Sequence, residues 1–345
     1  MTATPIDQST PSHELVWAAP RTFFGAPSVR DLGALDAQVA FLGVPYDAGT
    51  PQPGNRTGQA AGPSAARLRS WEQFDYGSPE GGALGWYDVE ADRDQLVGVT
   101  MADLGDVAIQ GSEVERNFER ITEAVRRLVG RGCLLVAVGG DHSISFPLVR
   151  GFEAIGEIDV VHVDAHADFL DELGGARLTG ASQLRRLSEL PFVRSLSALG
   201  LRNVERDEID GLRAYGAQWA TSLELERRPA EAVRRVVPRS DALYVSIDLD
   251  VLDASVVPGT TLPEPGGPSY RQLREALVEI ARRGRVVGFD IAELNPPHDP
   301  GAGTARVATW VITHFLSAIF EARSQPSSSE SSASNSASGS MPIDA

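Results

Sequence analysis

The sequence predicts a three-layer α/β/α protein, in which helices cover both faces of a mainly parallel β-sheet. Short apolar runs alternate with amphipathic helical stretches along most of the chain. Polar clusters follow directly on three of these runs. Strands that alternate with helices form parallel sheets, and ligands bind at the carboxyl ends of such strands. We therefore expect a functional site at that end of the sheet.

Each apolar run is assigned to a strand because it is short, rich in Val, Ile and Leu, and bounded by turn residues. The expected strands are residues 39–44, 133–138, 158–164, 193–201, 242–247 and 285–291. Stretches with apolar residues three and four positions apart are assigned to helices. The expected helices are residues 64–70, 114–131, 144–155, 182–190, 230–237, 270–283 and 305–323.

The chain divides into three parts by composition. Residues 1–34 contain several prolines and are expected to form an N-terminal arm, and residues 35–323 hold the α/β pattern. Residues 324–345 are mostly Ser with Ala, Gly and Pro. Such a composition buries too little apolar surface to offset the entropy of ordering, so we expect a disordered tail.

Composition and charge exclude several classes of function. A net charge of −16 gives the protein no general attraction to nucleic acid or to anionic membranes. The single cysteine, Cys133, lies in an apolar run and is expected to be structural, and no intrachain disulfide can form. The sequence contains neither a secretory signal pattern nor an apolar stretch of membrane-spanning length. We expect a cytoplasmic protein.

The densest polar cluster lies at the end of the apolar run 158–164. Asp164, His166 and Asp168 occupy every second position there. Residues two apart on an extended segment project to the same side, and the third can join the first two if the chain curls. Three such groups so close together repel one another unless a cation lies among them. This spacing predicts a metal site.

Two further clusters follow other predicted strands. If the three strands are neighbours, their ends meet in one crevice, where six side chains can surround two divalent cations. The expected ligands are His142, Asp164, His166, Asp168, Asp248 and Asp250. A carboxylate-rich set favours Mn²⁺ or a similar hard ion over structural zinc. Two ions about 3.5 to 4 Å apart can share a hydroxide, which indicates hydrolysis.

Some polar residues near the clusters have simpler interpretations. Asp141 is as well explained by a helix cap as by a ligand role. His162 is two residues before Asp164 and therefore projects to the same side of the strand, but it lies deeper in the strand, which favours a supporting role. The role of His298, in a proline-rich loop, is left open.

Seven short motifs occur in a fixed order, at residues 43–47, 55–63, 103–107, 139–143, 164–168, 246–253 and 288–297. Together they resemble the ureohydrolase family, which includes arginase, agmatinase and guanidinobutyrase. The resemblance covers roughly residues 35–320. The segment 293–299, Glu-Leu-Asn-Pro-Pro-His-Asp, and the long N-terminal arm are more similar to the agmatinase-like branch than to arginase itself.

The resemblance implies a binuclear manganese enzyme, with Ni²⁺ or Co²⁺ possible, that assembles as a homotrimer or homohexamer. Asp164 and Asp248 would bridge the ions, with His142 and Asp168 completing one site and His166 and Asp250 the other. A bridging hydroxide would attack the carbon of a small cationic guanidino substrate. Asp168 would carry the proton to the leaving amine, and Glu293 would hold the guanidinium. Urea and an amine would leave.

The chain departs from the family pattern at expected substrate positions. Thr179 stands where the family usually has a histidine, and Leu262 replaces a hydroxyl-bearing residue. In the entrance loop, Ala60 and Ala61 replace a common Arg-Phe pair, while Asn55 is retained and is expected to contact substrate. These changes predict a wider, less polar pocket and an N-alkylated or larger guanidino compound or biguanide as substrate.

Three alternatives remain at the level of sequence. The two-metal phosphoesterases use similar clusters, but their Gly-Asn-His segment and later His-x-His are missing here. The chain could also be a metal-bound but catalytically weak subunit that stabilises an active ureohydrolase paralogue in a hetero-oligomer. A third possibility is an ordinary agmatinase or guanidinobutyrase in which His298 replaces the missing imidazole.

Overall fold

The computed structural model describes residues 11–50, 56–74, 85–111 and 113–324. These residues form a nine-stranded sheet in which all neighbours are parallel except the first pair. In spatial order the strands are β1 (Val16–Trp17), β5 (Met101–Val107), β2 (Val39–Val44), β6 (Leu134–Gly139), β11 (Gly284–Ala292), β10 (Ser240–Asp248), β7 (Ile158–Val163), β8 (Val193–Leu201) and β9 (Gln218–Thr221).

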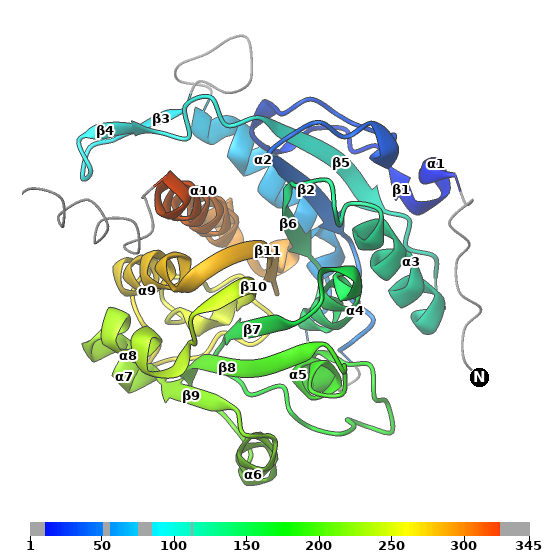
Figure 1. The fold of residues 1–345 in the computed structure, drawn as a ribbon. Coiled ribbons are helices and arrows are strands. Elements are labelled where there is room, and N and C mark those ends of the chain that lie inside the picture. The colour runs from blue at the N-terminus through cyan, green and yellow to red at the C-terminus, as the bar shows by residue number, and fades with distance from the viewer. Residues whose placement is uncertain (1–10, 51–55, 75–84, 112, 325–345) are drawn as a thin grey trace, which may run out of the picture.

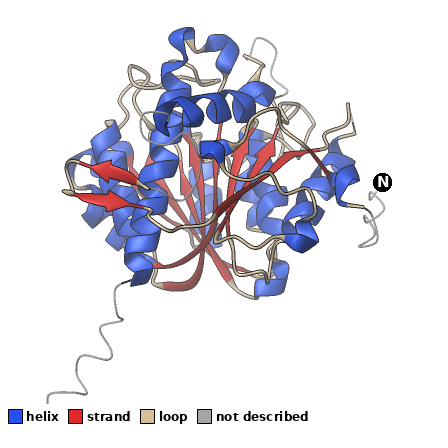
Figure 2. Ribbon diagram, turned by 90° about the horizontal axis from the view of Figure 1, so that it is seen from above, coloured by secondary structure: helices blue, strands red, loops and turns tan. Residues whose placement is uncertain are grey.

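Helices pack against both faces of this sheet, and each face has its own apolar core (Figures 1 and 2). One face is covered by α2 (Gly62–Phe74), α7 (Ser222–Arg227), α8 (Pro229–Val236), α9 (Tyr270–Arg283) and α10 (Gly303–Ser324). The other is covered by α1 (Ser12–Leu15), α3 (Val114–Arg126), α4 (Ser145–Arg150), α5 (Gln183–Leu187) and α6 (Arg206–Tyr215). The predicted three-layer α/β/α fold is confirmed. None of the described helices is both long and apolar enough to span a membrane.

The central strands are buried on both sides, which explains their sequences. Every residue of β6 and β7 is buried; β6 is aliphatic up to its final glycine, and β7 is aliphatic except for Asp159 and His162. Such runs are typical of parallel strands covered by helices on both faces. The order β6, β11, β10, β7 places the carboxyl ends of the three predicted ligand strands close together. It also inserts β11 between β6 and β10, which the sequence did not reveal.

Several short elements are present that the sequence pattern did not predict. The region 206–227 forms α6, β9 and α7, and a separate hairpin of β3 (Trp86–Asp88) and β4 (Arg93–Gln95) lies beside α10 (Figure 1). The helix expected over residues 144–155 ends at Arg150. Gly151 follows, and a Cβ there would lie 2.5 Å from the Cβ of Val125, so close packing against α3 occurs at this point.

The described part of the N-terminal segment packs against the sheet edge. β1 pairs antiparallel with β5, and Phe23 is fully buried, with its backbone N–H donating to Asp103 over 2.7 Å. The buried guanidinium of Arg67 lies 4.6 Å from the Phe23 ring centroid and bonds Asp103 and Asp106. Residues 1–10 and 325–345, which hold the rest of the predicted arm and most of the predicted tail, lie outside the described residues.

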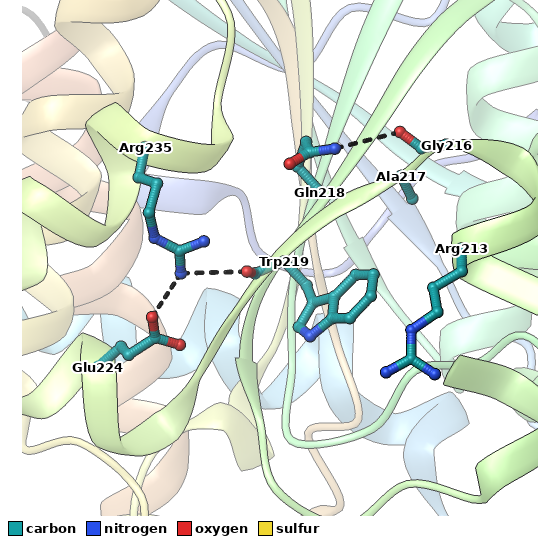
Figure 3. Close-up of a pocket in the computed structure, with 7 residues that line it drawn as sticks. All are labelled: Arg213, Gly216, Ala217, Gln218, Trp219, Glu224 and Arg235. Carbon is teal, nitrogen blue, oxygen red and sulfur yellow. Dashed lines mark hydrogen bonds and ion pairs between the residues drawn. The ribbon is translucent and has the colours of Figure 1, made fainter. Parts of the chain in front are cut away.

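A surface pocket lies at the opposite edge of the sheet, along β9 (Figure 3). Arg235 donates to the carbonyl of Trp219 over 3.2 Å and to Glu224 over 2.6 Å, while the Arg213 guanidinium lies 5.7 Å from the Trp219 ring centroid. These charged side chains come from α6, α7 and α8, which flank the edge strand β9, and an edge that is covered in this way is less open to the addition of another strand. We interpret this pocket as edge protection, because none of the expected ligands lines it.

Candidate metal centre

His142 is positioned by the sharp turn at the end of β6. The 3-10 turn His142–Ile144 begins there, and Asp141 caps it by accepting from the backbone N–H of Ser143 over 3.0 Å. The other oxygen of Asp141 accepts from the N–H of Gly49 over 2.6 Å. Burial, followed by the charge of Glu293, raises the pKa of Asp141 to about 7. Asp141 therefore acts as the cap that its sequence position allowed.

The end of β7 supplies three of the expected ligands. Asp164 is fully buried and accepts from the N–H of His166 over 2.7 Å. Asp168 has a φ of 48°, in the left-handed region that side chains other than glycine rarely adopt. The chain curls there, and an Asp168 carboxylate oxygen lies 3.0 Å from His142 Nδ1.

The end of β10 supplies the remaining two. A 3-10 turn, Leu249–Val251, follows the strand, and Asp248 caps it by accepting from the N–H of Asp250 over 2.8 Å. The second oxygen of Asp248 lies 3.3 Å from His142 Nδ1. An oxygen of Asp250 lies 3.3 Å from His166 Nδ1.

The closest atoms of the cluster converge without forming a hydrogen bond to each other. His142 Nδ1 also lies 2.9 Å from Asp164 Oδ2, yet both atoms are buried and without a hydrogen-bond partner among the described residues. His166 Nδ1 lies 3.3 Å from Asp164 Oδ1. Buried polar atoms without partners are costly, and donor atoms aimed at a common point fit bound cations. Five of the six expected ligands thus lie in two groups that share Asp164, and the first group also includes His162. Asp248, the sixth, adjoins the first group through its contact with His142.

Without cations, the titration of these groups is strongly shifted. Burial and then the charge of Asp164 raise the pKa of Asp168 to about 7, and burial raises that of Asp250 to about 6. Burial alone would lower the pKa of His142, but the carboxylates of Asp164, Asp168 and Asp248 raise it well above its ordinary value. The cation-free site therefore retains protons, which cations must displace.

His162 belongs to the first group of candidate ligands by distance, but both of its ring nitrogens already lie within hydrogen-bond distance of other protein atoms. Burial lowers its pKa to about 4, so the ring is neutral at physiological pH. Its Nε2 lies 3.0 Å from the carbonyl oxygen of His166, to which it can donate, and its Nδ1 lies 3.1 Å from Gln183 Nε2. Both ring nitrogens are used within the protein, although Nε2 is also 3.2 Å from Asp164. The geometry favours the supporting role expected from sequence.

A buried polar network, which the sequence motifs did not predict, lies behind His142. His142 Nε2 lies 2.8 Å from Ser246 Oγ, which donates to Asp290 over 3.0 Å. Asp290 also accepts from the hydroxyls of Tyr244 over 2.7 Å and Ser145 over 3.1 Å. An imidazole that donates through Nε2 presents a bare Nδ1 to a cation. The charged residue Asp290, inside the apolar run of β11, is the feature of the sequence that could have indicated this network.

Glu293 lies beside the candidate ligands at the end of β11. Its φ of 64° is also in the left-handed region. Its Oε1 accepts from the backbone N–H of His142 over 2.7 Å, and its Oε2 accepts from the Thr261 hydroxyl and from Gln59 Nε2, the latter over 3.2 Å. The side chains of Gln59 and Thr261 were not recognised as part of this site from sequence.

The other expected substrate residues lie in different environments. Thr179 is buried, and its hydroxyl bonds Ser182 Oγ over 2.9 Å within its own loop. Leu262 is 42% exposed, although it is a large apolar residue. His298 is exposed, and Asn55 lies outside the described residues.

The sheet and the cluster at its carboxyl end define a three-layer α/β/α protein with a candidate metal-binding site. The chain belongs to the arginase family, whose model matches residues 37–317. This finding confirms the resemblance to the ureohydrolases.

Individual relatives extend this comparison. The chain is 34% identical to the N(1)-aminopropylagmatine ureohydrolase of Thermus thermophilus over 265 residues, 76% of this chain and 84% of that protein. It is 32% identical to the guanidinopropionase of Pseudomonas aeruginosa over 315 residues, 87% of this chain and 92% of that protein. The structure of proclavaminate amidino hydrolase from Streptomyces clavuligerus has a TM-score of 0.76 at 25% identity, covering 89% of this chain and 99% of that one. The expected enzyme class, a hydrolase of C–N bonds, is confirmed.

Proposed function

We propose that this chain is a binuclear metal-dependent hydrolase that releases urea, or a substituted urea, and an amine from a guanidino compound. The observation that carries the proposal is the convergence of His142 Nδ1 with carboxylate oxygens of Asp164, Asp168 and Asp248 at 2.9 to 3.3 Å. These atoms lie beside Glu293, an anionic side chain outside the ligand groups. An adjacent anion suits a cationic substrate.

The proposed ligands divide between two ions. His142 and Asp168 would hold one, His166 and Asp250 the other, with Asp164 and Asp248 shared. Four carboxylates balance the charge of two divalent cations, and such an oxygen-rich set suits Mn²⁺, with Ni²⁺ or Co²⁺ as substitutes. When bound, a pair of such ions activates water for attack at neutral pH.

The chain itself would supply substrate binding and proton transfer. Glu293 would hold the guanidinium by charge-assisted hydrogen bonds. Asp168 would accept a proton from the attacking water and deliver it to the leaving amine. Both residues have left-handed backbone conformations, which are costly and concentrate at functional sites.

The residues around Glu293 support an N-alkylated or larger guanidino substrate. Leu262 exposes apolar surface directly after Thr261, whose hydroxyl bonds Glu293. Thr179, at the position of the usual family histidine, is buried with its hydroxyl engaged by Ser182. Neither side chain offers the proton-relay chemistry of an imidazole, and the exposed leucine favours an apolar substituent.

A substrate panel tests this proposal. The purified chain, loaded with Mn²⁺, Ni²⁺ or Co²⁺, is assayed for urea and amine release from agmatine, 4-guanidinobutyrate and N,N-dimethylated guanidines. We expect metal-dependent release with the highest kcat/KM on the alkylated compounds. A kcat/KM on agmatine of about 10⁴ M⁻¹s⁻¹ or more would contradict the wider pocket. Absence of release from every compound would contradict the hydrolase and favour the weak subunit of a hetero-oligomer.

The role of Glu293 has its own test. Glu293→Gln removes the anionic partner of the guanidinium, so turnover should fall sharply while two ions per chain remain bound. Glu275→Gln, on an exposed position of α9, is the matched control and should leave turnover unchanged. Loss of an ion in Glu293→Gln would identify Glu293 as a ligand instead. Light scattering on the same samples tests the proposed homotrimer or homohexamer.

A further inference from the structure

Gln59 is a buried glutamine that contacts the carboxylate of Glu293. It begins the 3-10 turn Gln59–Ala61 in the entrance loop and is fully buried. Its Nε2 lies 3.2 Å from Glu293 Oε2 and 2.5 Å from Thr261 Oγ. Its partners are 234 and 202 residues away in the sequence, so these bonds join distant segments of the chain at one point.

The orientation of this amide follows from its surroundings. A carboxylate only accepts hydrogen bonds when ionised, so the amide nitrogen and not the oxygen faces Glu293. The two N–H groups then serve Glu293 and Thr261, and the Thr261 hydroxyl is free to donate to Glu293 as well. Gln59 Oε1 is buried with no hydrogen-bond partner among the described residues. The side chain thus satisfies its donors and leaves its acceptor unpaired, so its orientation favours donation to Glu293 and to Thr261, which itself bonds Glu293.

Glu293 depends on such contacts for its orientation. Its Oε1 is held by the backbone N–H of His142, whereas Oε2 is held only by the Gln59 and Thr261 side chains among the described residues. Removing the Gln59 donor would leave Oε2 with the Thr261 hydroxyl as its one hydrogen-bond partner among the described residues, so the carboxylate would be less firmly oriented. A guanidinium needs two coplanar acceptor oxygens, and a misplacement of about 1 Å can cost on the order of a hundredfold in rate.

The loop that carries Gln59 is itself packed on the segment that carries Glu293. Gly58 has a φ of +126°, and a Cβ there would lie 2.9 Å from Asn295 Oδ1 and 2.7 Å from Pro297. Asn295 Nδ2 donates to the carbonyl of Arg56 over 3.3 Å. The entrance loop and the end of β11 therefore form one packed unit, so a shift of the loop moves the Gln59 amide relative to the Glu293 carboxylate.

We propose that Gln59 is a positioning residue that orients Glu293 for guanidinium binding and thereby links the entrance loop to substrate affinity. Gln59 acts through Glu293 and does not itself contact the substrate. This inference rests on the proposed function and deepens it, because it assigns the control of guanidinium binding to a residue outside the ligand clusters.

A double-mutant cycle on the full, Mn²⁺-loaded chain tests the proposal. Gln59→Leu keeps a similar volume without the donor, and Glu293→Gln removes the anionic acceptor. We expect Gln59→Leu to raise KM about 10-fold or more, with two ions retained and a smaller change in kcat. In the Glu293→Gln background, the same substitution should change KM little, because the residue through which it acts has lost its charge. Gln38→Leu, at the opposite end of β2, is the control for a general loss of a glutamine contact and should leave KM unchanged.

The possible outcomes separate this inference from the proposed function. If the wild type turns over a guanidine but the fold-changes in KM from the two single substitutions multiply in the double variant, Gln59 does not act through Glu293. Unchanged KM in Gln59→Leu would overturn the inference equally. If the wild type releases no urea from any guanidine, the proposed function fails and this inference with it. If Gln59→Leu does not fold, Gln59→Met replaces it. The cycle is also measured on the free energy of unfolding. Additive effects of the two substitutions on that free energy would again overturn the proposed coupling between Gln59 and Glu293.

Discussion

The hydroxyl of Ser246 is expected to control the metal affinity of His142. It lies 2.8 Å from His142 Nε2 and 3.0 Å from Asp290. The substitution Ser246→Ala removes the acceptor for the imidazole N–H inside a fully buried network. The ring is then free to turn, or to adopt the other tautomer and place its proton on Nδ1.

The size of this effect follows from the contacts that are lost. A buried polar group without a partner costs about 1 to 3 kcal/mol. The penalty applies most fully when a bound ion fixes the ring, because the cation-free imidazole can reorient to recover a partner. Since each 1.4 kcal/mol is about a tenfold change in affinity, we expect the ion at His142 to bind about 10 to 100 times more weakly.

Isothermal titration with Mn²⁺, followed by metal analysis after gel filtration, measures this change. Ser145→Ala is the matched control, because Ser145 bonds the same Asp290 oxygen over 3.1 Å and Ser246 over 2.9 Å but does not bond His142. It should weaken binding by no more than about threefold, because the bonds that it loses leave the contact between Ser246 and His142 in place. Wild-type affinity in Ser246→Ala, or an equal loss in Ser145→Ala, would refute the reasoning.

Three further predictions concern stability and pH. Cations should stabilise the fold by about 4 kcal/mol at a thousandfold excess over their dissociation constant, so chelation should lower Tm in calorimetry. An unchanged Tm, or two ions retained by Asp248→Ala, would show that the ligand assignment is wrong. Because Asp168 and Asp250 have pKa values raised to about 7 and 6, protons compete with cations below these values. Mn²⁺ affinity should therefore fall as pH decreases from 8 to 5. Calorimetry in buffers of different ionisation enthalpy should detect the release of protons on binding. An affinity that does not change with pH would contradict the assignment of Asp168 and Asp250 as ligands. Finally, Arg67→Met leaves the buried Asp103 carboxylate without its cation and should cost about 3 to 5 kcal/mol in denaturant unfolding, and a cost near zero would contradict the ion-pair role.

The candidate ligand residues could be selected from the sequence because their pattern is local. Alternation of Asp164, His166 and Asp168 at a strand end depends only on the geometry of an extended chain. The same holds for Asp248 and Asp250. The alternation of strands and helices was sufficient to predict the fold class. The left-handed φ of Asp168 matches the curl that the spacing required.

The surroundings of these residues were decided by tertiary structure. Nothing local in the sequence shows that β11 lies between β6 and β10, and this order is what places Asp290 behind His142 and Glu293 in front of it. Gln59 reaches Glu293 across 234 residues, so neither periodicity nor spacing could reveal the contact. Side-chain direction along a strand is a short-range property of the backbone, whereas strand order depends on burying apolar surface over both faces of the whole sheet.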